Sequence, residues 1–252
     1  MKIQYASDLH LEFHQNRDFL KENPLKPVGN ILILGGDIIP FDIIERYQDF
    51  LHFVSDNFET VYWLPGNHEY YKYDIADKSG CLHEAVKANV FLVNNTSAKV
   101  RDTKLVFSTM WSKIKPEDAE YIEQEMTDFE LIKYKGERFS FEAFNRLHDD
   151  CMHFLRRELT EENSGKTIVV THHVPTLQHY PEQYRNSILT EAFAVELSDW
   201  IATTPADFWI YGHHHFNAPE FKIGHTVMLT NQLGYVMWNE QYGFLPDKYL
   251  SV

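Results

Sequence analysis

Four short and almost uninterrupted apolar runs dominate the pattern of hydrophobic and polar positions along the chain. Each has the length of a strand, and each is followed within two residues by glycine, proline or histidine. Continuous apolar runs of this length are typical of strands that are covered on both faces. The runs are Ile31–Leu34, Val61–Leu64, Thr167–Val170 and Phe208–Tyr211, and a further short strand is expected from Ile3 to Ser7.

Between these runs the apolar residues take helical or hairpin spacing. A helix is predicted over 43–58 from the recurrence of Ile44, Tyr47, Leu51 and Val54. The charged, periodic segment 116–162 predicts two helices around a turn at Lys135–Gly136. The pattern leaves open whether this segment caps a site or packs at an edge. Hairpins are predicted from 98 to 107 and from 223 to 227.

The order strand, helix, strand in the first half predicts an α/β protein, a sheet with helices on its faces. We find no repeat, low-complexity stretch or linker, so residues 1–252 are predicted to form a single domain. Ligands of such sheets bind beyond the carboxyl ends of the strands. Asp8, Asp37 and Asn67 each follow a predicted strand. We therefore expect these three side chains on one rim.

Composition narrows the classes of partner. The chain has 252 residues and a formal net charge of -14, which disfavours long nucleic acids and anionic membranes. No apolar run reaches the ~20 residues that a bilayer requires, and no leader is recognised, so a cytoplasmic protein is expected. Cys81 and Cys151 lack metal-binding spacing, and both are predicted to be reduced thiols in the core or in a helix.

The polar residues that follow the first two strands suit metal ions. Asp8 and His10 are two residues apart, which would place both side chains on one face of an extended chain. A carboxylate and an imidazole suit zinc, manganese, iron, cobalt or nickel. Asp37 follows two glycines, where a carboxylate could bridge two ions. Read alone, each pattern also fits an ordinary polar turn.

Gly66-Asn67-His68-Glu69 is a more specific pattern. The side-chain oxygen of Asn67 is a candidate ligand, although an asparagine here could also be a helix N-cap. His68 could donate a proton to a leaving alkoxide, held in orientation by a nearby carboxylate. These residues give the pattern a catalytic interpretation as well as a structural one.

The second half supplies histidines. Adjacent residues of an extended chain face opposite sides, so one of His172 and His173 is expected to be a ligand. By the same alternation His213 and His215 share a face and His214 points away. Supporting or substrate-facing roles are predicted for the remaining nearby polar residues: Glu12, His14, Glu69 and His173.

The ordered set D-x-H, G-D, G-N-H-E, H and G-H-x-H resembles the calcineurin-like metallophosphoesterase superfamily. It is carried by Asp8 and His10, Gly36-Asp37, Gly66–Glu69, His172 and Gly212–His215. The longer sequence segments that surround these residues, together with residues 231–235 near the end of the sequence, are similar to those of a small bacterial and phage-type branch of this superfamily. Gly66–Glu69 departs from the G-N-R-D of a lipid-A-pathway hydrolase group, which argues against a lipid nucleotide substrate.

The resemblance implies a four-layer αββα sandwich with two mixed sheets and two divalent or trivalent transition-metal ions. One ion would be held by Asp8, His10, Asp37 and His215. The other would be held by Asp37, Asn67, His172 and His213. Asp37 would bridge together with a hydroxide, and His68 would assist the leaving group.

The expected activity is hydrolysis of phosphodiester or nucleotide-type phosphate esters. The expected partner is a small phosphate ester, with no long nucleic acid and no membrane. A phosphomonoesterase, acting on small molecules or proteins, and a non-catalytic metal-binding scaffold of the same fold are the alternatives. The native metal and the oligomeric state stay open.

Overall fold

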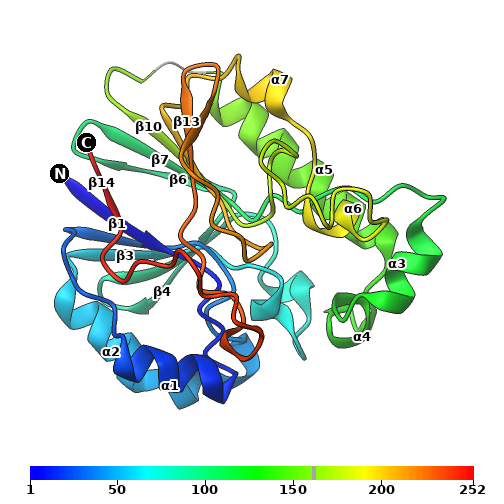
Figure 1. The fold of residues 1–252 in the computed structure, drawn as a ribbon, viewed down its shortest axis with the longest axis horizontal. Helices are drawn as coiled ribbons and strands as arrows, with labels where there is room; N and C mark the ends of the chain where they lie inside the picture. The colour runs from blue at the N-terminus through cyan, green and yellow to red at the C-terminus, as the bar shows by residue number, and fades with distance from the viewer. Residues whose placement is uncertain (161–162) are drawn as a thin grey trace.

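Two mixed sheets form the centre of the molecule (Figure 1). The computed structural model describes residues 1–160 and 163–252. In the first sheet, β1, β2, β3 and β5 run parallel, and the edge strands β14 and β4 are antiparallel to their neighbours. The order is β14-β1-β2-β3-β5-β4, with β1 (Lys2–Ala6), β2 (Ile31–Leu34), β3 (Thr60–Trp63), β4 (Leu82–Lys87), β5 (Val90–Asn94) and β14 (Tyr249–Ser251).

The second sheet repeats this plan. Its inner strands β7, β10, β11 and β13 run parallel, whereas the edge strands β6 and β12 are antiparallel to their neighbours. The order is β12-β13-β11-β10-β7-β6, with β6 (Thr96–Val100), β7 (Thr103–Ser108), β10 (Thr167–Thr171), β11 (Phe208–Ile210), β12 (Phe221–Ile223) and β13 (Thr226–Leu229). Both predicted hairpins are present as β6–β7 and β12–β13.

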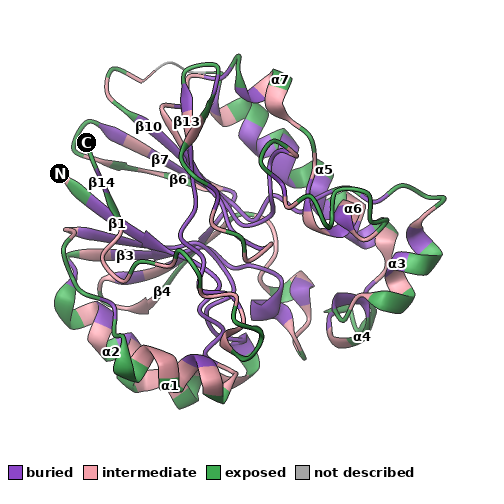
Figure 2. Ribbon diagram, viewed as in Figure 1, coloured by how far each residue is buried: buried purple, intermediate pink, exposed green. Residues whose placement is uncertain are grey.

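Alternate residues of the strands face two different cores. Ile31 and Ile33 pack between the sheets, together with residues such as Ile168 of the second sheet. Leu32 and Leu34 point the other way, toward the outer helices. All of these strand positions are buried (Figure 2). The continuous apolar runs thus arise because each strand is covered on both faces.

Helices cover the outer faces of both sheets (Figure 1). Leu51 and Val54 of α2 pack on the first sheet, and Leu155 of α5 packs on the second. The helices are α1 (His14–Glu22), α2 (Gln48–Asn57), α3 (Ala119–Glu125), α4 (Asp128–Leu131), α5 (Phe141–Glu158), α6 (Thr190–Phe193) and α7 (Ser198–Ile201). Two helical layers around two mixed sheets confirm the predicted αββα fold class.

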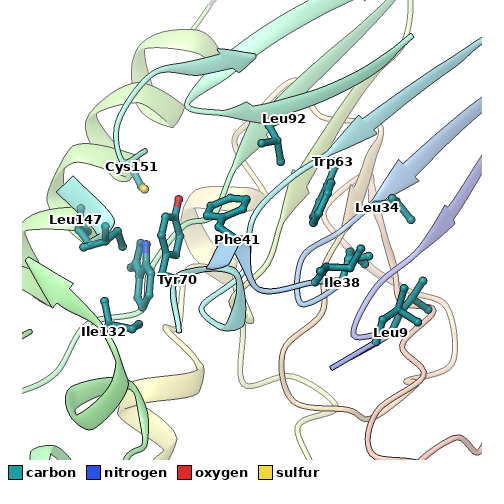
Figure 3. Packing of buried hydrophobic residues seen from close by; sticks show 14 of the residues in the cluster. Leu9, Leu34, Ile38, Phe41, Trp63, Tyr70, Leu92, Ile132, Leu147 and Cys151 are labelled. Atoms are coloured by element: carbon teal, nitrogen blue, oxygen red, sulfur yellow. The ribbon is translucent and has the colours of Figure 1, made fainter. Parts of the chain in front are cut away.

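The outer core of the first sheet continues into the helical segment. Trp63 and Phe41 pack near the strand ends, and the same buried cluster extends through Tyr70 to Ile132 and Leu147 (Figure 3). Fully burying each such side chain stabilises the fold by about 1.5–3 kcal/mol. The segment from α3 to the start of α5 thus shares one continuous apolar cluster with the outer face of the first sheet.

Two predicted helical regions differ in detail. The helix expected over 43–58 begins as a 3₁₀ helix, η1 (Phe41–Tyr47), before α2. The turn at Lys135–Gly136 joins two short strands, β8 (Lys133–Tyr134) and β9 (Glu137–Arg138), not two helices. Both turn residues have positive φ, 56° and 82°, which is the geometry of a tight hairpin turn. The predicted end of this segment includes 161–162, which lie outside the described residues.

Some elements were not expected. Residues 14–22 form α1, and neither this helix nor β4, β5 and β14 had a counterpart in the prediction. Cys151 is buried in α5 as predicted, but Cys81 is exposed, and so its prediction as a core or helix thiol is wrong. Of the helices described, none is both long and apolar enough to span a bilayer.

Candidate metal centre

The carboxyl ends of five parallel strands meet at one place. Asp8, Asp37 and Asn67 lie beyond β1, β2 and β3 of the first sheet, and His172 and His213 lie beyond β10 and β11 of the second. Parallel strands bring their carboxyl ends to one edge of a sheet, and the two edges face each other here. The prediction that the first three residues share a rim is therefore met by the geometry.

The backbone at this rim is not extended. Asp8, His10, Asp37, His213 and His215 have positive φ values of 56°, 46°, 57°, 77° and 52°. The argument from alternation along an extended chain therefore does not apply, although His213 and His215 both reach the centre. A residue other than glycine in this region costs of the order of 1–3 kcal/mol. The surrounding contacts hold the chain in this conformation.

Asp8, His10, Asp37 and His215 form the first group of candidate ligands. Their side-chain donor atoms all lie within 4.8 Å of one another. His215 Nε2 is 3.0 Å from His10 Nε2 and 3.5 Å from Asp8 Oδ1. His10 Nε2 is 3.7 Å from Asp37 Oδ2. Asp8, His10 and Asp37 are almost completely buried.

A second group shares Asp37 with the first. Its other members are His172 and His213, with donor atoms again within 4.8 Å of one another. His172 Nε2 lies 3.3 Å from both Asp37 Oδ1 and Asn67 Oδ1. All seven predicted ligands thus lie in one cluster, with Asp37 common to both groups.

The second nitrogen of each imidazole in the two groups faces an oxygen acceptor. His10 and His215 donate from Nδ1 to Glu12 and Glu240, at 3.1 and 2.6 Å. His172 Nδ1 donates to the Gly35 carbonyl at 2.9 Å, and His213 Nε2 faces the Ala192 carbonyl at 3.4 Å. Such contacts fix the tautomer and leave the other nitrogen free to bind a metal.

The ring nitrogens that point into the cluster need a positively charged partner, because the groups around them are other nitrogens and carboxylates. In the neutral tautomers, the lone pairs of His10 Nε2 and His215 Nε2 face each other at 3.0 Å beside two buried carboxylates. Burial lowers the pKa of His213 well below its ordinary value, and the nearby His173 and His172 lower it further. The buried donors, imidazole nitrogen and carboxylate oxygen, therefore fit transition-metal ions.

Because residue 66 is a glycine, the backbone there can lie directly beside the candidate ligands Asp37 and His172. A Cβ added there would overlap Asp37 Oδ1 and His172 Nε2. Its N–H donates to Glu69 Oε2 at 2.7 Å. The neighbouring Pro65-Gly66 turn thus approaches the candidate ligands more closely than any residue with a side chain could.

Glu69 fixes the turns around the centre. Its buried carboxylate accepts from the N–H groups of Asp37 and Ile38 at 2.8 and 2.7 Å, and from Trp63 Nε1 at 3.0 Å. Burial raises the pKa of this carboxyl to about 7, and Asp37 raises it as well, whereas the N–H donors oppose the shift. Glu69 therefore supports the Asp37 turn from behind.

His68 lies beside the first group and is held by Glu12. Glu12 Oε1 is 2.8 Å from His68 Nδ1 and 3.1 Å from His10 Nδ1. The Tyr235 hydroxyl is 3.1 Å from His68 Nε2. Burial alone would lower the pKa of His68, but Asp37 and Glu12 raise it above its ordinary value. Although burial opposes the shift, His10 and His68 lower the pKa of Glu12 to about 2.

The other two predicted supporting residues differ in position: the ring of His173 packs on the candidate ligand His213, with centroids 4.1 Å apart, whereas His14 lies at the start of α1. His173 is buried and faces Ser112, with Nδ1 3.2 Å from the hydroxyl, and it belongs to neither ligand group. His14 is exposed at the start of α1, and no hydrogen bond joins it to the centre in the described parts of the chain. The supporting or substrate-facing role of His14 therefore stays a prediction.

Sequence reasoning missed three groups that position the candidate residues. Asp128 of α4 accepts from Asn67 Nδ2 and from the Tyr71 hydroxyl, both at 2.8 Å, and so turns the Asn67 oxygen toward His172. Glu240 holds His215, and Tyr235 contacts His68. Tyr235 belongs to a recognised motif, but no local pattern marks Asp128 or Glu240.

A cavity of about 350 Å³ opens above the two groups. Asp37, Asn67, His68 and His213 lie in its lining. Residues 125–127, at the junction of α3 and α4, form part of one wall. The predicted helical segment thus contributes a wall of the cavity, and a small molecule could reach the candidate ligands from it.

Two facing sheets with a histidine- and aspartate-rich centre at their shared edge are the arrangement expected of a metallophosphoesterase. The model of the family described as calcineurin-like phosphoesterase matches residues 1–217. The chain therefore belongs to this family, and the predicted resemblance is confirmed. The family implies divalent metal ions and a phosphoester hydrolase.

Similar proteins include a viral relative and two solved structures. An uncharacterized protein, L509, of Acanthamoeba polyphaga mimivirus is 29% identical over 279 aligned residues, which cover 99% of this chain and 96% of that protein. The crystal structure of the phosphopantetheinyl hydrolase PptH from Mycobacterium tuberculosis matches with a TM-score of 0.71 and 17% identity, over 99% of this chain and 95% of that one. A dimetal phosphatase from Danio rerio matches with a TM-score of 0.51 and 12% identity, over 92% and 87%. These two structural likenesses concern the fold.

Replacing Gly66 by alanine should reduce metal binding. The added methyl group would displace Asp37 and His172, which belong to the same candidate group. Elemental analysis after reloading with Mn²⁺ should show fewer than two ions per chain. Gly80→Ala is the control, because nothing lies within 4 Å of its added Cβ, although the φ of Gly80, unlike that of Gly66, is positive. Full metal loading of Gly66→Ala would contradict the assignment.

Proposed function

We propose that this protein hydrolyses phosphodiester or nucleotide-type phosphate esters with two metal ions, and that His68 assists the leaving group. The observation that supports this most directly is that Asp37 belongs to both ligand groups, while His68 shares their cavity. A carboxylate common to two ions fits a site in which both ions contact one phosphate. The proposed substrate is a small ester, in keeping with the size of the cavity.

The proposed ligand sets follow the two groups. Asp8, His10, Asp37 and His215 would hold one ion, and Asp37, Asn67, His172 and His213 the other. When bound, two such ions neutralise charge on a phosphate and make water a better nucleophile near neutral pH. The oxygens of Glu12, Gly35, Ala192 and Glu240 keep the imidazoles in the required tautomers.

In this proposal His68 delivers its proton from Nε2. Its Nδ1 is occupied by Glu12, and so Nε2 is the atom left for the leaving oxygen. The Tyr235 hydroxyl next to Nε2 can hold the ring until an ester replaces that contact. Asn67 contributes its side-chain oxygen as a ligand, and Asp128 keeps that oxygen directed at the centre.

Hydrolysis should depend on metal. Protein stripped by a chelator should not cleave bis-p-nitrophenyl phosphate or p-nitrophenyl phosphate. Reloading with Mn²⁺, Fe²⁺, Zn²⁺, Co²⁺ or Ni²⁺ should restore turnover of one of them, and the faster substrate identifies a diesterase or a monoesterase. Asp37→Ala should stay inactive under all conditions. Two bound ions without turnover of either ester would favour the scaffold alternative.

Replacing His68 by alanine should lower turnover of an ester with a poor leaving group, such as a phenyl ester, about 10²–10⁴-fold, the usual contribution of general acid catalysis. Both ions should stay bound, because His68 is outside the two ligand groups that share Asp37. Turnover and metal content are measured on the same sample. Loss of metal together with activity would show that His68 is a ligand, and its proposed role would be wrong.

Glu12→Gln should affect esters with poor leaving groups most. The change removes the charge that holds His68, so loss of turnover should grow from p-nitrophenyl to phenyl esters, reaching about 10–100-fold. The measurement is kcat across a series of aryl esters, with metal content as control. Equal losses across the series would mean that Glu12 serves only to orient His10.

A further inference from the structure

The residues that form the walls of the cavity above the metal centre indicate what kind of substrate could bind there. Three segments far apart in the sequence supply them: the α3–α4 junction, the segment 180–193 around α6, and the segment 235–240. Figure 1 shows α3, α4 and α6 on the same side of the molecule. None of these segments belongs to the strands that position the candidate ligands, so they contact whatever extends from the phosphate.

Aromatic side chains form much of these walls. Tyr180, Tyr184 and Phe193 come from one segment, Trp238 from another, and Tyr71 lies beside His68. Tyr184 and Trp238 are 48% and 63% exposed. Exposed aromatic side chains at the mouth of a concave site gain contact area when a flat apolar ligand covers them. They therefore favour an aromatic or similarly apolar substituent.

Apart from the imidazoles of the metal centre, His68 included, the described lining of the cavity offers no side chain that carries a positive charge. Among the described residues that line it there is no lysine or arginine, whereas Glu125 and Glu240 contribute carboxylates. Arg185 follows Tyr184 in the chain, but its guanidinium donates to the Leu177 carbonyl at 3.2 Å and lies 3.9 Å from Glu182. Beyond the metal centre, a second phosphate would have no partner of opposite charge, in a chain whose formal net charge is -14.

We propose that this cavity selects esters that carry a single phosphate on a flat, apolar and otherwise uncharged substituent. The selection rests on the proposed function, because the one phosphate is held by the two metal ions. Simple aryl esters with one phosphate belong to this class. Compounds with further phosphates, such as nucleoside diphosphates and oligonucleotides, are disfavoured because the described walls carry no lysine or arginine and Glu125 adds a carboxylate.

Binding of phosphonates tests this without turnover, because their carbon–phosphorus bond is not hydrolysed. The Kd values of methylphosphonate, phenylphosphonate and benzene-1,4-diphosphonate are measured by calorimetry on the Mn²⁺-loaded protein. The phenyl group should tighten binding about tenfold, as expected for one aromatic contact. The second phosphonate should remove at least that gain at low ionic strength, and 0.5 M NaCl should reduce its effect.

Substitutions in the walls test whether wall residues cause the tighter binding of the phenyl compound. Tyr184→Ala and Trp238→Ala should each weaken phenylphosphonate several-fold and leave methylphosphonate unchanged. Tyr121→Ala is the matched control, because Tyr121 is also 48% exposed but lies outside the cavity lining. It should change neither Kd.

The outcomes separate this selection from the proposed function. Equal binding of methyl- and phenylphosphonate, or tighter binding of the diphosphonate, would overturn the selection and leave the metal centre in place. Failure of all three compounds to bind the metal-loaded protein would remove the phosphate site, and with it both proposals. An unchanged preference for phenylphosphonate in the Tyr184 and Trp238 variants would also show that these walls do not cause the selection.

Discussion

The arrangement of this protein depends on one constraint: each buried imidazole of the two ligand groups must find a partner for both of its ring nitrogens. One nitrogen of His10, His172, His213 and His215 faces an oxygen of the protein. The other nitrogens converge with Asp8 and Asp37, and among the described residues no lysine or arginine forms a salt bridge with either carboxylate. A buried space with this composition is stable only with cations in it, whether protons or metal ions. The fold thus builds a site that requires cations, and the metal ions that the family implies can supply them.

Meeting that constraint costs backbone conformational energy. Asp8, His10, Asp37, His213 and His215 all have left-handed φ values at the ends of otherwise regular strands. The strands anchor one side of each turn, and Glu69 anchors Asp37 and Gly66 from the other through their N–H groups. The continuous core below, from Trp63 to Leu147, keeps these turns from relaxing. Packing, turn geometry and the chemistry of the centre therefore act together.

Much of the fold and of the candidate site could be predicted from the sequence, because both depend on where buried strands begin and end. Runs such as Ile31–Leu34 predict doubly covered strands, and strand ends predict where Asp37 lies. Other features depend on contacts that sequence spacing does not encode. Asp128 and Glu240 act on residues 61 and 25 positions away, and α1 lacks a strong apolar stripe and a side-chain N-cap hydrogen bond. The alternation assumed for Asp8 and His10 fails because the chain leaves the extended conformation before reaching them.

The division of the candidate ligands between the two sheets has a mechanical consequence. Asp8, His10, Asp37 and Asn67 extend from the first sheet, and His172, His213 and His215 from the second. Each ion in the proposed ligand sets would therefore be held by residues of both halves of the sandwich and would act as a cross-link between them. The resistance of the whole domain to unfolding would then rise with the concentration of free metal, since binding to the folded state alone stabilises it. In a cell, the supply of metal would set the lifetime of the protein as well as its activity.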